Sequence, residues 1–345
     1  MADYYQEAFM KKSLLCVILA IFIAFNAAGN GVSEDSPENS VTVYCYDSFL
    51  GDWGPGAAIE KGFEEKTGID VNLVSCGSAV EMIEKIRYEG SSCPADLVIG
   101  IEDSMKIDFS LFEPVTLPSE VKLASSLSIQ EGVLVPFDYG VYSFVADTTK
   151  ITDLPTCLDD LTLPQYKDRV ILIDPRTSSV GMGLLLWTID VYGKDGYLGW
   201  WEKMQANALT IADSWSSGYG LFTEGEAPLV ISYTTSPVYH VMYEDTTTIR
   251  ALEFTDGHHE CIEYAGILKT AKHKKAAQTF LNYVLTDGQE EIAVDNSMFP
   301  ANSSTELPDA FAYAVTPAKL FATDREEIAA NSDKFLAAWS EAMVK

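Results

Sequence analysis

Positive charge is scarce in this sequence. Its 345 residues include 23 lysines and arginines against 51 aspartates and glutamates, which gives a formal net charge of −28 at pH 7. No stretch interleaves basic with aromatic side chains. Proteins that bind nucleic acids neutralise phosphates with clustered basic residues. We therefore expect no nucleic-acid partner for this chain.

Motifs that mark common catalytic centres are also absent. The sequence contains no GxSxG, HExxH or GxxxxGKS/T pattern, and "GMGLLLW" lacks the third glycine of a dinucleotide-binding turn. His258 and His259 would point to opposite faces of a strand, which favours a structural role over a metal site. His240 and His273 have no evident partner. The sequence thus predicts neither an enzyme active site nor a metal centre.

Long apolar runs are limited to one, at residues 14–25, which follows Lys11 and Lys12 and precedes a group of small residues. This succession is typical of a secretory signal peptide. We expect cleavage near Ala28 or Gly29, so that residues 1–29 form an N-terminal extension and signal peptide. The alternative is a membrane anchor, but the run is short for a helix that spans a bilayer. The mature protein is expected to be soluble outside the cytoplasmic membrane.

The cysteines do not have the spacing of metal-binding or thiol-redox motifs. Cys16 lies within the apolar run, without the cleavage context of a lipid anchor. The cysteines after the signal peptide are Cys45, Cys76, Cys93, Cys157 and Cys261. An oxidising compartment permits disulfides, and Cys45 and Cys76 end two successive predicted strands. Buried free thiols are the favoured interpretation, since unpaired cysteine is among the most buried residue types.

Apolar strands alternate with amphipathic helices in the region that follows the signal peptide. Strands are predicted over residues 41–49, 69–76 and 95–102, and helices over 54–68 and 78–90. In the second helix, Ser78 is followed three residues later by Glu81, which is a capping-box signature. A β-α-β-α-β order with continuously apolar strands predicts a parallel, doubly wound sheet.

A second α/β region follows an extended crossing segment at residues 134–147. It is predicted to contain strands over 169–175 and 227–237, a helix over 178–193, an extended return over 251–268, a helix over 273–291 and a helical tail from residue 309. We therefore predict a two-lobed α/β fold, with mainly parallel sheets and a hinged cleft between the lobes. Lobe 1 would comprise residues 41–138 and 256–300, and lobe 2 residues 139–255 and 301–345. Ligands of such sheets bind beyond the carboxyl ends of the strands.

Two of these strand ends are rich in hydroxyl groups. "DPRTSS" contains Thr177, Ser178 and Ser179, and "SYTTSP" contains Tyr233, Thr234, Thr235 and Ser236. Hydroxyls and unpaired backbone N–H groups at a helix start form a site for an anion or a hydroxyl. Ordinary helix capping is the alternative for both turns, and Pro237 supports it for the second.

Aromatic residues gather at the same strand ends, among small and polar residues. They are Tyr46, Trp53, Trp215, Tyr219, Tyr233 and Tyr239. Their faces suit a flat or cationic organic ligand, through stacking and cation–π contact. Asp47 and Asp52 would add negative potential for a cation, although solvated or capping roles fit these two residues equally well.

The stretches "VTVYCYDSFLGDWGPG", "VPFDYG", "DPRTSSVGMGLLLW", "GYGLF" and "ISYTTSPVYH" resemble the thiamine-binding periplasmic proteins of bacterial ABC importers. The similarity runs from about Val41 to the C-terminus. It implies a two-lobed, type II periplasmic binding fold that is usually monomeric and has no cofactor. The implied function is to capture thiamine, thiamine monophosphate or thiamine diphosphate and to deliver it to a membrane permease.

The resemblance also implies a role for each site residue. The phosphate or hydroxyethyl end of the ligand would be held by Ser178, Ser179, Tyr233, Thr234, Thr235, Ser236 and the turn at Ser78 and Ala79. Trp215 would cover the thiazolium ring, while Tyr46 and Tyr239 would flank the aminopyrimidine. Trp53 belongs to the same predicted aromatic cluster.

Two positions depart from the family pattern. Ser297 stands where relatives carry a tryptophan that packs on the ligand, and the turn at Ser78 and Ala79 lacks their acidic-glycine pair. Loss of one stacking face would weaken binding by about 1 kcal/mol or more, or would reflect a preference among the phosphorylated forms.

Two other functions fit the same fold. One is a receptor for another small solute, although the adjacent tyrosines of iron-binding relatives are absent after the signal peptide. The other is a secreted thiamine-degrading enzyme, which needs a cysteine nucleophile and a carboxylate base. Cys76 is the cysteine nearest to the Ser78 turn.

Overall fold

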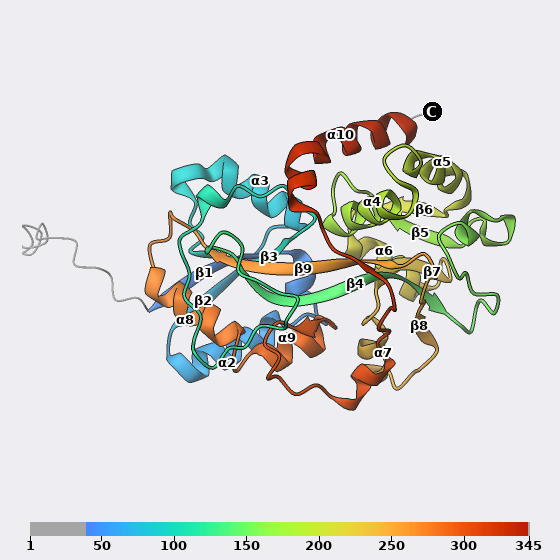
Figure 1. Ribbon diagram of the computed structural model, residues 1–345. Coiled ribbons are helices and arrows are strands. Elements are labelled where there is room, and N and C mark those ends of the chain that lie inside the picture. Colours follow the sequence, from blue (N-terminus) through green and yellow to red (C-terminus); the bar gives the residue numbers. More distant parts are fainter. Residues whose placement is uncertain (1–38, 344–345) are drawn as a thin grey trace, which may run out of the picture. The chain divides into compact units, whose positions relative to one another are not determined.

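The computed structural model describes residues 39–343. The predicted N-terminal extension and signal peptide lie outside the described residues. Within residues 39–343, no helix is long and apolar enough to cross a membrane. These residues form an eleven-stranded sheet, with helices packed on it, whose principal strand order is β2-β1-β3-β9-β4-β7-β5-β6 (Figure 1).

The first half of this sheet is the predicted β-α-β-α-β unit. It consists of β1 (Ser40–Cys45), α2 (Gly56–Thr67), β2 (Asp70–Ser75), α3 (Ala79–Glu89) and β3 (Leu97–Glu102). β1 pairs in parallel with both β2 and β3, as predicted. Ile59 and Phe63 bury the inner face of α2, and Gly68 ends this helix in a left-handed conformation with φ 69°. The capping box forms at the start of α3, where the Ser78 hydroxyl accepts from the Glu81 N–H.

Two long strands connect the halves of the sheet (Figure 1). β4 (Val135–Asp147) pairs with β9 (His258–Ile267) along its first part and with β7 (Leu229–Tyr233) and β8 (Ile249–Ala251) along its second part. The predicted crossing at residues 134–147 is therefore confirmed. The sheet is mixed, because β4 and β9 run antiparallel to these neighbours and β9 to β3. The extended return predicted over 251–268 is interrupted before β9 by a turn with Gly257 at φ 97°.

The second half of the sheet contains more helices than the sequence predicted. It comprises β5 (Val170–Ile173), α4 (Ser179–Tyr192), α5 (Tyr197–Asn207), β6 (Thr210–Ala212), α6 (Trp215–Glu224), β7 and α7 (Pro237–Tyr243). β5 pairs in parallel with β6 and β7. The elements α5, β6 and α6 were not predicted, because glycine, serine and aromatic residues obscure the periodicity of this region.

The C-terminal part differs from the long helices expected there. The predicted helix over 273–291 is two helices, α8 (Lys274–Val284) and α9 (Gln289–Asp295), separated by a turn in which Gly288 N–H donates to the Tyr283 carbonyl. The tail begins as a 3-10 turn, Asp309–Tyr313, and becomes helical only in α10 (Arg325–Met343). Pro317, which has no backbone N–H, stands between them. Two short strands, β10 (Phe299–Pro300) and β11 (Leu320–Phe321), pair with β4 and β9.

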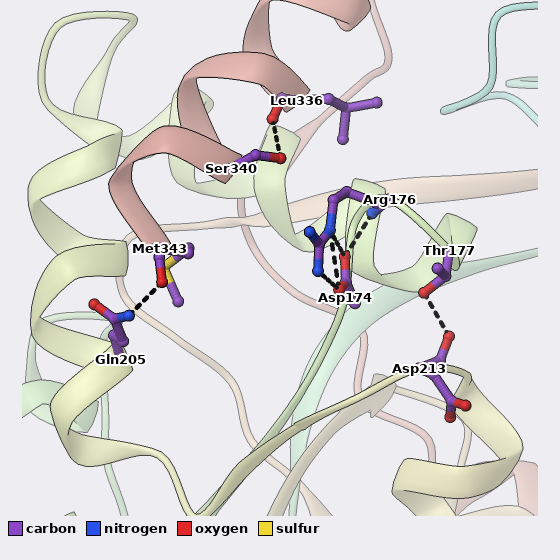
Figure 2. A network of polar contacts seen from close by, with 8 residues as sticks. All are labelled: Asp174, Arg176, Thr177, Gln205, Asp213, Leu336, Ser340 and Met343. Atoms are coloured by element: carbon purple, nitrogen blue, oxygen red, sulfur yellow. Dashed lines mark hydrogen bonds and ion pairs between the residues drawn. The ribbon is translucent and has the colours of Figure 1, made fainter. Parts of the chain in front are cut away.

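α10 packs on α5, in the second half of the sheet (Figure 1). The ring of Trp339 meets Trp201 edge to face, with centroids 5.5 Å apart, and the Arg176 guanidinium lies 5.1 Å from the centre of the Trp339 ring. At the end of α10, the Gln205 amide donates to the Met343 carbonyl at 2.5 Å (Figure 2). These contacts hold the C-terminal helix against α5 and against the turn that precedes α4.

The cysteines of the described residues are all free. Cys45 and Cys76 lie on neighbouring segments, and the Cys76 N–H donates to the Cys45 carbonyl at 2.9 Å. Their side chains belong to different apolar clusters, that of Cys45 around Phe63 and that of Cys76 around Tyr44. The structure agrees with free thiols rather than a disulfide between these two residues.

Candidate functional site

A cavity of about 290 Å³ lies where strand ends and helix starts from both halves of the sheet meet. Most of the site residues predicted from the sequence line it: Tyr46, Trp53, Ser78, Ala79, Ser178, Ser179, Trp215, Tyr233, Ser236 and Tyr239. Thr234 and Thr235 do not line the cavity. Both side chains are fully buried, and the Thr234 N–H donates to the Val141 carbonyl at 2.8 Å, which continues the sheet.

One side of the cavity is aromatic. Trp215 and Tyr219 lie one turn apart on α6 and stack, with ring centroids 4.9 Å apart and an interplanar angle of 21°. Trp53, from the loop after β1, meets Trp215 edge to face at 5.3 Å. We call Trp53, Trp215 and Tyr219 the aromatic stack. It offers the ring faces that stacking and cation–π contact require.

Hydroxyl groups behind the aromatic stack hold it in place. The Trp215 indole N–H donates to the Ser232 hydroxyl at 2.9 Å, and the Ser232 and Ser236 hydroxyls lie 2.8 Å apart. Ser236 also accepts from the Tyr233 N–H at 3.2 Å. Although Ser236 is the N-cap of α7, it makes no side-chain capping bond to that helix. The capping interpretation therefore does not account for Ser236, whose hydroxyl supports the ring of Trp215.

The turn before α4 is held rigidly by polar contacts. The Arg176 guanidinium forms an ion pair with Asp174, with 2.5 Å between Nη2 and Oδ2, and the Thr177 hydroxyl donates to the Asp213 carbonyl at 2.7 Å (Figure 2). The hydroxyl of Thr177 is thus occupied by the protein. This turn fixes the position at which α4 begins.

The start of α4 forms a second side of the cavity. Ser178 is the N-cap but makes no side-chain capping bond, and Ser179 is the first helical residue. The Ser179 hydroxyl donates to the Glu102 carboxyl group. The unpaired N–H groups at this helix start, with the Ser178 hydroxyl, are an arrangement that attracts an anion or a hydroxyl.

The start of α3 provides a third side, through Ser78 and Ala79. The Asp47 N–H donates to the Gly77 carbonyl at 2.7 Å, which holds this turn against the loop after β1. The Ser78 hydroxyl and N–H both take part in the capping box. The capping signature at Ser78 is therefore confirmed, and both the hydroxyl and the N–H of Ser78 are hydrogen-bonded to Glu81.

Asp47 links the two halves of the described structure across the cavity. Its carboxylate accepts from the Ser216 hydroxyl of α6 at 3.1 Å and from the Ser48 N–H at 2.7 Å. The sequence left open whether Asp47 adds negative potential or caps a turn. In the structure it lines the cavity and bonds to its own turn as well.

Both histidines that the sequence left without an evident partner have one. His240 Nδ1 lies 2.7 Å from a Glu244 carboxylate oxygen, and its Nε2 lies 2.8 Å from the Tyr219 hydroxyl. His273 Nδ1 lies 3.1 Å from an Asp96 oxygen. Glu244 is one helical turn from His240 and was detectable in the sequence, whereas Asp96 is remote from His273 along the chain.

His258 and His259 are both buried, away from the cavity. His258 Nδ1 lies 2.8 Å from the Tyr142 carbonyl, and His259 Nδ1 lies 2.6 Å from an Asp190 oxygen. These contacts fit the structural role predicted for the pair.

Two further predicted tyrosines, Tyr46 and Tyr239, line the cavity. The Tyr46 hydroxyl accepts from the Asn296 amide at 2.8 Å, and its ring packs over Gly100, where a Cβ atom would lie 2.0 Å from the ring. The Tyr239 ring meets that of Tyr243 at 5.0 Å. Asn296 was not predicted, since it contacts Tyr46 from a distant part of the chain.

Buried carboxyl groups at the bottom of the cavity were also not predicted. Glu102 and Glu263 line the cavity, and Asp138 on β4 is paired with Glu263 on the adjacent strand β9. Burial raises the pKa of all three carboxyl groups, that of Asp138 to about 8 and that of Glu263 well above its usual value. The sequence pattern did not single out these acids, because Glu102 ends β3 and Glu263 shares β9 with other polar residues.

Glu102, Cys261 and Glu263 each place one potential metal ligand within 4.8 Å of the others. The Glu102 oxygens, however, accept from Ser179 and, at 2.7 Å, from the Tyr142 hydroxyl. Burial also raises the pKa of the Cys261 thiol well above its usual value, so the thiol stays protonated. The group is therefore better suited to hydrogen bonding than to holding a metal.

Cys76, the nucleophile that the thiamine-degrading alternative would use, does not line the cavity. Its thiol donates to the Val74 carbonyl at 3.5 Å, and burial raises its pKa to about 11. Since the thiolate is the reactive form, the geometry gives Cys76 no role as a nucleophile in this cavity.

Known proteins resemble this chain along nearly its whole length. Residues 103–331 match the family model described as bacterial extracellular solute-binding protein. The thiamine-binding periplasmic protein of Escherichia coli strain K12 is 36% identical over 308 residues, which cover 88% of this chain and 93% of that protein. The chain belongs to the thiamine-binding periplasmic protein family.

Other members of the family agree with this assignment. The thiamine-binding periplasmic protein of Brucella melitensis biotype 1 is 34% identical over 88% of this chain and 91% of its own length. A solved structure described as a periplasmic thiamin binding protein has a TM-score of 0.83 at 34% identity, and the match covers 91% of this chain and 98% of that one. The predicted resemblance and the two-lobed, type II periplasmic binding fold are therefore confirmed.

Proposed function

We propose that this protein is the receptor of a bacterial thiamine importer. It captures thiamine or one of its phosphate esters in the periplasm and delivers it to the membrane permease of an ABC transporter. The observation that carries the proposal is a cavity that combines an aromatic stack, buried carboxyl groups and hydroxyl-bearing helix starts. The names of its relatives agree with this function.

Each part of thiamine has a suitable surface in the cavity. The aromatic stack, with Trp215 at its centre, would cover the cationic thiazolium ring, where a cation–π contact contributes about 0.5–2 kcal/mol. Tyr46 and Tyr239 would flank the aminopyrimidine. The Ser178 hydroxyl and the first N–H groups of α4 would bind the hydroxyethyl or phosphate end.

Closure of the two lobes would hold the ligand. We place lobe 1 at residues 41–138 and 256–300, and lobe 2 at residues 139–255 and 301–345, so that β4 and β9 carry the hinge. Asp47 of lobe 1 accepts from Ser216 of lobe 2 at 3.1 Å. A ligand that contacts both lobes favours the closed state through its differential affinity, and a monomer suffices for this mechanism.

Calorimetric titration with thiamine, thiamine monophosphate and thiamine diphosphate tests the proposal. Trp215→Ala is expected to weaken binding about tenfold or more, which corresponds to about 1.4 kcal/mol, because the central ring of the aromatic stack is lost. Tyr88→Ala is the matched control, since the Tyr88 side chain is 92% exposed and outside the cavity. Failure of the unmodified protein to bind any of the three compounds would refute the proposal.

A further inference from the structure

Three acidic side chains stand side by side on adjacent strands, and two of them, Glu102 and Glu263, line the cavity. Glu263 on β9 is paired with Glu102 on β3 and with Asp138 on β4. Residues paired in this way in antiparallel strands have Cβ atoms about 4.5–5.5 Å apart on one face of the sheet. We call Glu102, Glu263 and Asp138 the acidic row.

No cation neutralises the acidic row. Among residues 39–343, none of its carboxyl groups forms an ion pair with a lysine, arginine or histidine. The other titratable groups that face the row are Asp103 after β3, Tyr142 on β4, Cys261 on β9, Tyr46 after β1 and Tyr233 on β7. All of these are neutral or negative. Like charges placed opposite each other destabilise a sheet, so the free protein keeps part of the row protonated, in agreement with the raised pKa values of Asp138 and Glu263.

Within the described part of the chain, two oxygen atoms of the acidic row have no hydrogen-bond partner, Asp138 Oδ1 and Glu263 Oε2. Glu263 is only 6% exposed and lines the cavity. Buried acceptors are rarely left unpaired in folded proteins. A hydrogen-bond donor on a ligand in the cavity would satisfy the unpaired oxygen of Glu263.

The groups around Glu263 are already organised for such a ligand. The Asn296 amide donates to Asp138 Oδ2 at 2.9 Å and to the Tyr46 hydroxyl at 2.8 Å. Glu102, by contrast, is satisfied by Ser179 and Tyr142. Glu263 is thus the member of the row that both lines the cavity and keeps an oxygen available.

We propose that Glu263, supported by Asp138, Tyr46 and Asn296, receives the nitrogen-bearing heteroaromatic ring of the ligand, and that ligand capture releases a proton from the acidic row. This inference rests on the proposed function. An aminopyrimidine presents its amino N–H to the Glu263 acceptor, and the attached thiazolium brings a positive charge into the same cavity. The donated hydrogen bond and the positive charge both favour an ionised carboxylate. The proton held by the row therefore passes to the buffer when the ligand binds.

The direction of the pH dependence follows from burial. Because burial raises the pKa of Asp138 and Glu263 in the free protein, the row holds a proton at neutral pH. The cationic ligand lowers these pKa values. Ligand affinity should therefore rise with pH between the lowered and the raised values, by about tenfold per pH unit for one released proton.

Calorimetry with thiamine in two buffers of different ionisation enthalpy, between about pH 6 and pH 8, counts the released protons. The unmodified protein is expected to release about one proton per thiamine bound. Glu263→Gln keeps the shape of the side chain but cannot ionise. It should abolish most of the proton release and weaken thiamine binding about tenfold or more near pH 8.

Glu260→Gln is the matched control. It changes an acid on the same strand that points to the other face and lies outside the cavity, so affinity and proton release should both stay unchanged. Thermal unfolding checks that each variant is folded. Asp138→Asn, which should also reduce the proton release, replaces Glu263→Gln if that variant does not fold.

The outcomes separate this inference from the proposed function. If the unmodified protein binds thiamine without releasing protons, and Glu263→Gln binds it equally well, the inference is overturned and the proposed function stands. If the unmodified protein does not bind thiamine, both are overturned. Weaker binding by Glu263→Gln with unchanged proton release would contradict the coupling to the acidic row.

Discussion

Ser297 shows how a single residue can adjust the cavity. It is buried and lines the cavity between Asn296 and Met298, at the position where the family resemblance leads us to expect a tryptophan. Its hydroxyl donates to the Val294 carbonyl at 3.3 Å. The small side chain offers the ligand no stacking face where a tryptophan would offer one.

Ser297→Trp should restore that face and tighten thiamine binding by about 2-fold to 10-fold, since an aromatic pair contributes about 0.5–1.5 kcal/mol beyond its buried area. Calorimetric titration measures the change. Ser297→Ala is the control and should bind as the unmodified protein does. Weaker binding by Ser297→Trp would mean that the cavity has no room for an indole beside the ligand.

At the scale of elements, the contact between α4 and β4 positions the bottom of the cavity. Gly183 of α4 lies against the ring of Tyr142 of β4, where a Cβ atom would come within 2.1 Å of that ring. The Tyr142 hydroxyl in turn donates to Glu102. The glycine therefore allows the close approach that places Tyr142 beside the acidic row.

Gly183→Ala should destabilise the protein by about 1–3 kcal/mol, because the added methyl group overpacks this contact, and should also weaken thiamine binding. Gly199→Ala is the matched control in helix α5. A Cβ atom there meets nothing within 4 Å, so this change should stabilise by about 0.5–1 kcal/mol. Urea unfolding measures both effects, and equal stability of the two variants would contradict the packing argument.

At the scale of the whole molecule, the net charge of −28 affects the rate at which a charged ligand associates with the protein. A negative protein attracts cationic thiamine and repels the anionic diphosphate, and salt screens both effects over about 10 Å at 0.1 M. We expect added salt to slow the association of thiamine and to speed that of thiamine diphosphate. Stopped-flow tryptophan fluorescence can follow both, since Trp53 and Trp215 line the cavity. The same salt response for the two ligands would exclude steering by net charge.

Local features of the fold were predictable because they depend on neighbouring residues. The capping box at Ser78, the start of α4 at Ser179 and the crossing strand at residues 134–147 all follow from patterns of a few residues. The break between α8 and α9 was missed, although the pair Asp287 and Gly288 between them is typical of a turn. The tail was predicted as too long a helix, since composition alone does not mark the effect of Pro317.

The sequence by itself determined the order of the first β-α-β-α-β unit, the family and most of the residues that line the cavity, because turn and cap chemistry and short motifs are local. Only the tertiary structure decided which side chains meet at the bottom of the cavity. Glu102, Asp138 and Glu263 lie on β3, β4 and β9, and the order β3-β9-β4 in the sheet is not their order in the chain. Pairing between distant strands depends on the packing of the whole sheet, so no local pattern could place these three carboxyl groups in one row.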